Sequence, residues 1–341
     1  SDGFAQKNDL ARGGYNPAII EVANGASLRL ENITINDAFR QEADTYLEQV
    51  TGGDNKNNEQ KVQDAIIAAY HGGGTITLGS GTTLKNFGGM SAVRIGGQGE
   101  SDSSSSKLIM ESGSKIVDDS LGSRKGGVAA IWSQGGIVEM KAGSSVSNID
   151  GRAIFLEDGG VADVYGAISD ITANSYMTFD PGKGSNPGGG GTNNGFAGIA
   201  AAITGNSTFT LGEGGTVSNI VSDAGNASDI AFMLVGSSLV TEKGSKISDI
   251  NTIGIVDNNG GKININGTVS DCTTKNVLFR LRGAAVTFVL GEGGLIENVS
   301  TTDAGIVYLN GGTPTVEISG TIQNAEVGRS TWAVIFMSPN G

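Results

Sequence analysis

The stretch GIVEMKAGSSVSNIDGRAIFLEDGGVADVYGAISDI, residues Gly136–Ile171, contains one short sequence cycle twice. In this cycle an alternating apolar run ends at a glycine turn, the tetrapeptide V-S-N-I or I-S-D-I follows, and a second apolar run comes next. The rest of the chain repeats the cycle. Self-similarity at a period of this size indicates supersecondary units that stack on one another.

Each cycle can be anchored on the apolar residue after its glycine turn, such as Val146 or Ile168. A tenth, degenerate cycle spans residues 18–37 and is anchored on Ile35. Asn and Asp tolerate the left-handed turn conformation, and their side chains can bond from rung to rung. We therefore predict a structural ladder of the residues two positions after the nine clear anchors, which are all Asn or Asp: Asn86, Asp118, Asn148, Asp170, Asn219, Asp249, Asp271, Asn298 and Asn324.

Each cycle carries short strand-like runs bounded by Gly, Asn and Asp, which is typical of β-strands. Stacking such strands coil on coil gives a parallel β-solenoid. The sequence therefore predicts an all-β fold, a parallel β-helix of about ten rungs. At a strand spacing of ~4.8 Å, ten rungs make a rod of roughly 50 Å.

Three segments carry a resemblance to a known family: GTITLGSGTTLKNF (Gly74–Phe87), STFTLGEGGTVSNI (Ser207–Ile220) and GLIENV (Gly294–Val299). They resemble rungs of the right-handed parallel β-helices of the pectin-lyase-like fold, and more narrowly the repeat regions of bacterial surface proteins and adhesins. The resemblance covers residues 74–341 and implies a right-handed helix. It says little about activity, because this fold hosts lyases, hydrolases, tailspikes and adhesins alike.

The chain divides into a strand and helix capping region, residues 1–73, and a β-helix, residues 74–341. A helix is expected over residues 58–71, where apolar residues follow the 3.6-residue period, and a second one over 38–50. Such a helical cap would cover the open end of the solenoid. A long loop insertion is expected at 172–206, because the anchors on either side of it are unusually far apart.

Composition limits the partners and the setting of the protein. The 341 residues have a formal net charge of −13, which argues against nucleic acid or an anionic membrane as a partner. No apolar stretch approaches the ~20 residues of a membrane helix. The single cysteine, Cys272, is expected to be a buried, inert thiol. We expect the chain to be a segment of a larger exported protein with further domains, secreted or located on a bacterial cell surface.

The second apolar run of each cycle is apolar on both sides, which a solvated strand should not be. The expected inward column is Ile131, Phe155, Phe232, Phe279, Val307 and Val334. The opposite column contains the candidate ligand-binding residues: Trp132, Leu156, Met233, Arg280 and Tyr308, with Ile335 beyond them. Three explanations stay open: cover by the chain itself, cover by a partner or glycan, or a wrong alignment of these runs.

No catalytic, metal or cofactor site is predicted. The only histidine, His71, is expected to close the predicted helix. The adjacent Asp118 and Asp119 are better explained by a turn than by paired catalysis, since neighbouring strand residues point to opposite faces. Arg280 and Arg282 share a face and could bind an acidic ligand, but no nearby acid cluster was apparent. The Gly-His-Gly and Arg-x-Lys segments of pectin-lyase-like hydrolases are absent.

These observations favour a noncatalytic, adhesin-like segment of a bacterial surface protein. It would present loops and one face of a β-helical rod to a host or matrix ligand, either a glycan or a protein. A polysaccharide lyase or glycoside hydrolase of the same fold is one alternative. A purely structural spacer is the other.

Overall fold

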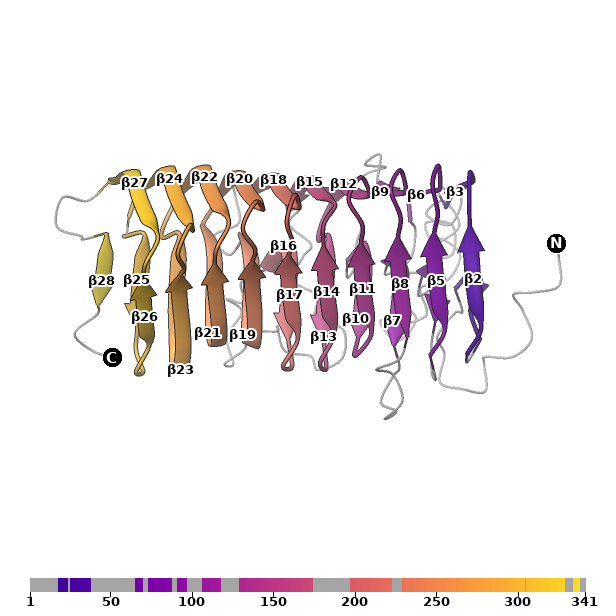
Figure 1. Ribbon diagram of the computed structural model, residues 1–341, viewed down its shortest axis with the longest axis horizontal. Helices are drawn as coiled ribbons and strands as arrows, with labels where there is room; N and C mark the ends of the chain where they lie inside the picture. The colour runs from indigo at the N-terminus through magenta and orange to yellow at the C-terminus, as the bar shows by residue number, and fades with distance from the viewer. Residues whose placement is uncertain are drawn as a thin grey trace, which may run out of the picture.

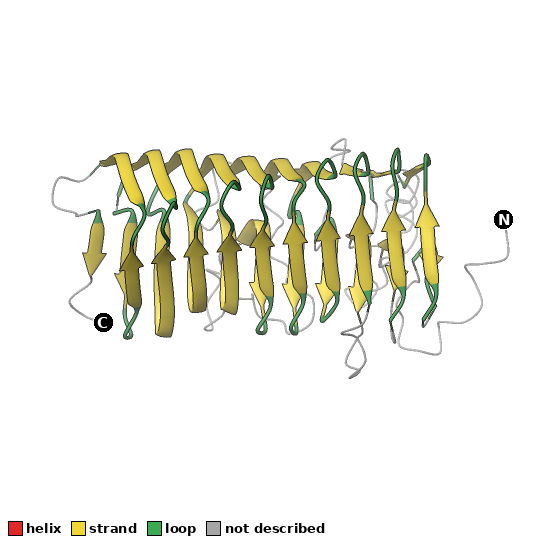
Figure 2. Cartoon of the chain, viewed as in Figure 1, coloured by secondary structure: helices red, strands yellow, loops and turns green. Residues whose placement is uncertain are grey.

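Successive coils of the chain stack their strands in parallel along one axis, from the N-terminal strands at one end to the C-terminal strands at the other (Figure 1). The computed structural model describes residues 18–23, 25–37, 65–69, 73–87, 91–96, 106–117, 129–173, 197–222, 229–303, 305–328 and 334–337. These residues form strands and turns, and none of them forms a helix (Figure 2). The predicted all-β parallel β-helix is confirmed.

Two sheets run the length of the rod. The first has 18 strands and takes the first two strands of the coils: β1 (Ile20–Glu21), β2 (Ser27–Leu30), β4 (Ala65–Ala69), β5 (Thr75–Leu78), β7 (Ser91–Gly96), β8 (Lys107–Met110), β10 (Ile131–Gln134), β11 (Ile137–Met140), β13 (Ile154–Glu157), β14 (Val161–Val164), β16 (Ala197–Thr204), β17 (Thr208–Leu211), β19 (Asp229–Thr241), β21 (Gly254–Ile265), β23 (Phe279–Leu290), β25 (Val307–Asn310), β26 (Thr315–Ile318) and β28 (Ile335–Met337). From β19 to β23 the two strands of a coil merge into one longer strand.

The second sheet takes the third strand of each coil. Its ten strands are β3 (Thr34–Asn36), β6 (Thr83–Lys85), β9 (Lys115–Val117), β12 (Ser145–Asp150), β15 (Ala167–Ala173), β18 (Thr216–Ser222), β20 (Lys246–Thr252), β22 (Thr268–Thr274), β24 (Leu295–Thr301) and β27 (Thr321–Val327). Ile35 in β3 pairs with Leu84 in β6, so the degenerate tenth cycle is a coil of the rod. The predicted number of about ten rungs is confirmed.

The inward side chains of all three strands form one core along the rod. In register, Val138 of β11 lies beside Ala162 of β14, which lies beside Phe209 of β17, and all three are fully buried. Along these strands burial alternates residue by residue, as period-2 side-chain direction requires. Each large apolar side chain buried in this way contributes about 1.5–3 kcal/mol.

The chain bends within the second sheet at the predicted Asn/Asp ladder. In β12, Val146 and Ile149 are buried while Asn148 between them is exposed. A left-handed residue at that position turns the following side chain back into the core, which simple alternation would have pointed outward. The eight described ladder residues all have φ between 49° and 57°: Asn86, Asn148, Asp170, Asn219, Asp249, Asp271, Asn298 and Asn324. Asp118 lies outside the described residues.

Hydrogen bonds connect several rungs of this ladder. Asn219 Nδ2 donates to Asp170 Oδ1 at 2.6 Å, and Asn298 Nδ2 donates to Asp271 Oδ1 at 3.4 Å. The hydroxyl of Ser270 donates to Asp271 Oδ2 at 2.7 Å. This hydrogen bond, with help from Asn298 and Lys246, lowers the pKa of the Asp271 carboxyl. The ladder residues therefore stabilise the bend in two ways, by their left-handed backbone conformation and by side-chain hydrogen bonds between coils.

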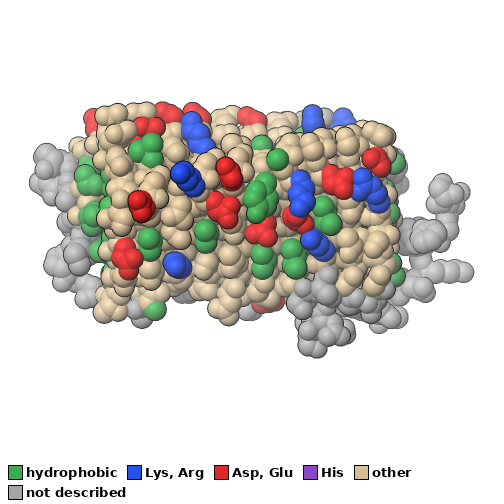
Figure 3. Space-filling view, viewed as in Figure 1, with side chains coloured by type: hydrophobic (Ala, Val, Ile, Leu, Met, Phe, Trp, Pro, Cys, Tyr) green, Lys and Arg blue, Asp and Glu red, His purple; other side chains and the backbone are tan. Residues whose placement is uncertain are grey.

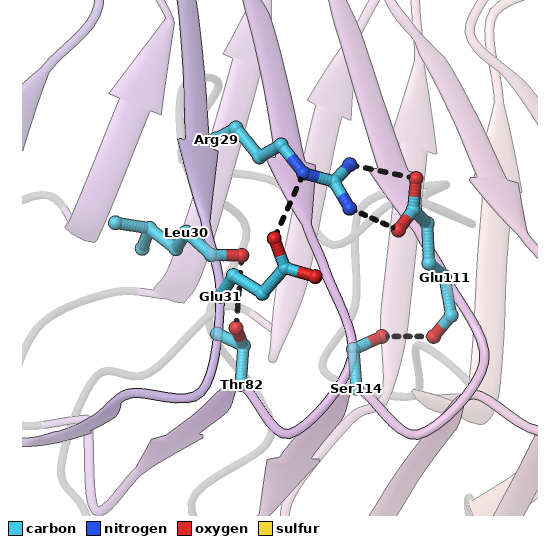
Figure 4. Close-up of polar contacts among 6 residues, drawn as sticks. All are labelled: Arg29, Leu30, Glu31, Thr82, Glu111 and Ser114. Carbon is cyan, nitrogen blue, oxygen red and sulfur yellow. Dashed lines mark hydrogen bonds and ion pairs between the residues drawn. The ribbon is translucent and has the colours of Figure 1, made fainter.

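An ion pair connects coils on the outer surface near the N-terminal end. The guanidinium of Arg29 in β2 donates to both carboxylate oxygens of Glu111, at 2.8 and 2.7 Å, and its Nε lies 3.4 Å from Glu31 Oε2 (Figure 4). In the intervening coil, a Cβ on Gly79 would lie 3.1 Å from Arg29 Nη2. These hydrogen bonds lower the pKa of Glu111. Their contribution is therefore present at neutral pH and is lost as the pH falls, and solvent keeps it small.

The expected helix over residues 58–71 is wrong where the structure describes it. Residues 65–69 form strand β4, which pairs with β1 on one side and β7 on the other. All five of its side chains are fully buried. A strand covered on both faces has no alternation, so its apolar run also satisfies a helical period. The rest of this segment, including His71, and the expected helix over 38–50 lie outside the described residues.

The expected insertion at 172–206 is shorter in the structure. Strand β15 continues to Ala173, and β16 begins at Ala197 and pairs with β13 and β19. Residues 197–206 thus belong to a regular coil. Residues 174–196 lie outside the described part of the chain.

Substitutions at Asn219 test whether the left-handed backbone conformation of the ladder contributes to stability. Asn219→Ala keeps a small side chain but places an L-residue other than Asn at φ 52° and removes the bond to Asp170. We expect a loss of about 1–2 kcal/mol in the free energy of unfolding, measured by chemical denaturation. The matched control Asn219→Gly accepts this φ and should lose less. Equal losses in both variants would contradict the role of the left-handed conformation.

The core includes a buried amide that works against stability. Asn258 in β21 is fully buried between Leu234 and Leu281 of the neighbouring coils, and its Nδ2 and Oδ1 find no hydrogen-bond partner among the described residues. We expect Asn258→Leu to stabilise the protein by about 1–3 kcal/mol, since it removes an unsatisfied amide. The exposed Asn251→Leu should change stability by less than about 0.5 kcal/mol. An unchanged or lower melting temperature for Asn258→Leu would contradict this account.

Candidate functional site

The predicted ligand-binding column lies on the outer side of the first strands of the coils. The register places one outward residue of each strand beside the next: Arg94 (β7), Trp132 (β10), Phe155 (β13), Ala202 (β16), Met233 (β19), Asp257 (β21), Arg280 (β23) and Tyr308 (β25). Trp132, Met233, Arg280 and Tyr308 therefore share a column, as predicted. Whether they bind a ligand stays a prediction.

The structure corrects this column at two places. Trp132 pairs with Phe155, and Leu156 lies one position further, fully buried in the central core. At the C-terminal end, Val307 pairs with Ile335. Ile335, and not Val334, therefore occupies the position in register with the inward column. A shift of one residue moves a side chain to the opposite face of a sheet. The run of Ile154, Phe155 and Leu156 is apolar at every position, so its pattern alone did not specify the register.

The chain itself covers the first part of the outer column. Trp132 is 4% exposed and packs in a second apolar cluster with Ala129, Phe155, Ala202 and Met233. Its indole Nε1 donates to Glu157 Oε1 at 2.9 Å, and the Arg94 guanidinium lies 3.7 Å from the ring centroid. Burial within a single chain explains why strands β10 and β13 are apolar on both sides. Trp132 and Met233 are thus inaccessible to a ligand in this conformation.

Beyond Met233 the column becomes charged. Asp257 in β21 is fully buried and accepts hydrogen bonds from both Arg280 and Arg282 of β23. The two Nε atoms lie 3.1 and 2.9 Å from Asp257 Oδ1, and the Nη2 atoms of both residues donate to Oδ2. The acid that was not apparent beside the two arginines is therefore Asp257. It fixes both guanidiniums against the strand.

Exposure is unequal within this cluster. The side chain of Asp257 is 0% exposed, while those of Arg280 and Arg282 are 15% and 26% exposed. Tyr308, half-buried, and Asn310, exposed, pair with Arg280 and Arg282 from the next coil. Charge-assisted bidentate pairs of this kind are short, strong and directional. The cluster can therefore present polar groups of fixed geometry to solvent.

Asp257 is not among the site residues predicted from the sequence, although the sequence carries a signal for it. Asp257 precedes Arg280 by 23 residues, close to the 22-residue spacing between Val146 and Ile168 and between Ile247 and Val269. The motif Val256-Asp257-Asn258 takes the place that Phe-Met-Leu occupies in the preceding coil. A charged residue at a position that is apolar in the preceding coil requires a partner.

The opposite outer surface, formed by the second strands of the coils, is mixed in character. Figure 3 shows this face with Lys, Arg, Asp and Glu side chains interspersed among hydrophobic and uncharged groups. Lys107 Nζ lies 2.7 Å from Glu139 Oε2, and Lys141 also pairs with Glu139. Interspersed exposed charges of this kind are typical of a solvated surface.

Among the described residues, no group of three or more His, Cys, Asp and Glu side chains could hold a metal ion. Asp118 and Asp119 lie outside these residues. The described part of the chain likewise has no helix of the length and apolarity needed to cross a membrane. The sequence matches no protein-family model, and comparisons with curated proteins and with solved structures give no match. The pectin-lyase-like resemblance therefore stays a prediction beyond the parallel β-helix itself.

Cys272 lies in the inward column of the second sheet and is 1% exposed. Burial raises the pKa of its thiol to about 12. Because the thiolate is the reactive form, we expect no reaction with a disulfide reagent at pH 8 in the folded protein. After denaturation the same thiol should react within minutes, which the released chromophore measures. Rapid reaction of the folded protein would contradict the burial of this column.

Proposed function

We propose that this chain is a noncatalytic, adhesin-like segment of a bacterial surface protein that presents one face of a β-helical rod to an extracellular ligand. The observation that carries the proposal is the rigid cluster of Asp257, Arg280 and Arg282 at the accessible end of an otherwise buried outer column. Strand-borne groups with locked geometry suit recognition, because little conformational entropy is lost on binding.

The same cluster argues against chemistry at this place. Both oxygens of Asp257 are occupied by guanidinium groups, and the side chain is buried, so a substrate has no access to it. General acid–base catalysis needs a carboxyl group within hydrogen-bond reach of the substrate. A lyase or hydrolase would have to use residues elsewhere in the chain. The proposed location is the cell surface or the extracellular medium.

A glycan array with the purified chain tests the proposal, together with ultraviolet monitoring of acidic polysaccharides for unsaturated products. Retention of a ligand without new absorbance is the expected result. Tyr308→Ala should then weaken retention, whereas Trp132→Ala should mainly lower stability, by about 3–5 kcal/mol, because Trp132 is buried. Unsaturated products would overturn the proposal in favour of a lyase. Absence of both retention and products would favour a structural spacer.

A further inference from the structure

Three Asn-Gly sequences have both of their residues in the described part of the chain: Asn259-Gly260, Asn266-Gly267 and Asn310-Gly311. In such a pair the backbone nitrogen of the glycine can attack the side-chain amide of the asparagine, because glycine has no side chain that blocks the approach. The attack requires rotation of the asparagine backbone and a glycine N–H that is not held by an acceptor. Because the dipeptide is the same in all three places, the structure decides which pair reacts.

Two of these pairs are held by their neighbouring coils. Gly267 is buried, and its N–H donates to Thr241 Oγ1 at 3.1 Å. The N–H of Asn266 donates to the carbonyl oxygen of Thr241 at 3.0 Å. Asn259 lies inside strand β21 and is paired on both sides, with β19 and with β23. Rotation at either pair would first have to open contacts between coils, which costs free energy.

The third pair lacks this restraint on one side. Asn310 is the last residue of β25 and is exposed. At the equivalent place in an earlier coil, Gly135 follows β10 and donates its N–H to the carbonyl oxygen of Glu157 in the next coil, at 2.9 Å. The strand that follows β25 in the stack is β28, which ends one position short of Asn310 in register. Among the described residues, the N–H of Gly311 forms no hydrogen bond.

The backbone after Asn310 also has room to move. A Cβ placed on Gly311 would meet no atom within 4 Å. Gly311 and Gly312 both have positive φ, 84° and 75°, and two glycines in succession give the chain wide conformational freedom. Asn310 is paired with β23 on one side only. It can therefore rotate toward the nitrogen of Gly311 more easily than the other two asparagines can rotate toward theirs.

We propose that Asn310 is a site of spontaneous deamidation in the folded chain, with water as the only co-reactant. The nitrogen of Gly311 gives up its proton to solvent and forms a bond to Asn310 Cγ, while the bond from Cγ to Nδ2 breaks and that nitrogen leaves as ammonia. Water then adds to the succinimide ring and opens it to aspartate or to isoaspartate. One water is consumed and one ammonia is released, with no oxidation or reduction.

The modification changes the charge of the outer column. Asn310 pairs in register with Arg282, so the product places a carboxylate beside the cluster of Asp257, Arg280 and Arg282. Isoaspartate also adds a methylene to the backbone at the end of β25. The inference goes beyond the proposed function and does not depend on it, because it concerns the chemistry of the chain itself.

The test follows all three pairs in the wild-type chain during incubation in mildly alkaline buffer. Samples are digested at intervals, and aspartate and isoaspartate at each pair are measured by mass spectrometry of the peptides. Asn310 should convert about tenfold or more faster than Asn259 and Asn266, because these two react only after a local opening of the coils. Circular dichroism during the incubation checks that the chain stays folded.

Incubation in denaturant is the matched control, because it removes the structure and leaves the sequence unchanged. The three pairs should then convert at similar rates, since little structure protects any of them. In the folded chain, Asn310→Gln should abolish the fast conversion and leave the slow conversion at Asn259 and Asn266 as it was.

Two results would overturn the proposal. One is conversion of Asn259 or Asn266 in the folded chain at the rate of Asn310. The other is an Asn310 that stays intact in the folded chain, because this would show that the fold protects it.

Discussion

The in-register hydrogen bonding of each coil to the next is the constraint on which the rest of the structure depends. A short strand has no partners within its own coil, so its backbone N–H and C=O groups are satisfied only by the coils before and after it. Stacking in this way brings equivalent residues into columns along the rod. The core, the Asn/Asp ladder and the outer cluster are each formed by residues of such columns.

The left-handed corner decides which columns face the core. At Asn148 and its equivalents, one residue with positive φ allows apolar residues three positions apart to point inward. This local device explains the V-S-N-I pattern in physical terms. It also explains the choice of Asn and Asp, which accept this conformation and bond to the next rung through their side chains. The corner is thus both a backbone requirement and a source of cohesion between coils.

The outer column shows how one sheet face can change character along a rod. From Trp132 to Met233 it is apolar and covered by the chain itself. From Asp257 onward it is charged, and its exposure begins at Arg280. The transition follows from single substitutions in a repeated pattern, since Asp257 occupies the place that Met233 fills one coil earlier and Arg280 fills the same place in the next coil. A repeat architecture therefore allows a recognition site to be built without disturbing the core behind it.

The sequence by itself determined the solenoid, the number of coils and the ladder positions, because period-2 alternation and tolerance of positive φ are local properties of the chain. Only the tertiary structure decided whether a fully apolar run forms a strand and which of its side chains face the core. Residues 65–69 are a strand and Leu156 faces inward, since pairing with neighbouring coils selects one of several conformations compatible with the same apolar pattern. The pairing of Asp257 with Arg280 and Arg282 was likewise decided by register. Residues more than 20 positions apart meet only when coils stack, and no local pattern encodes that contact.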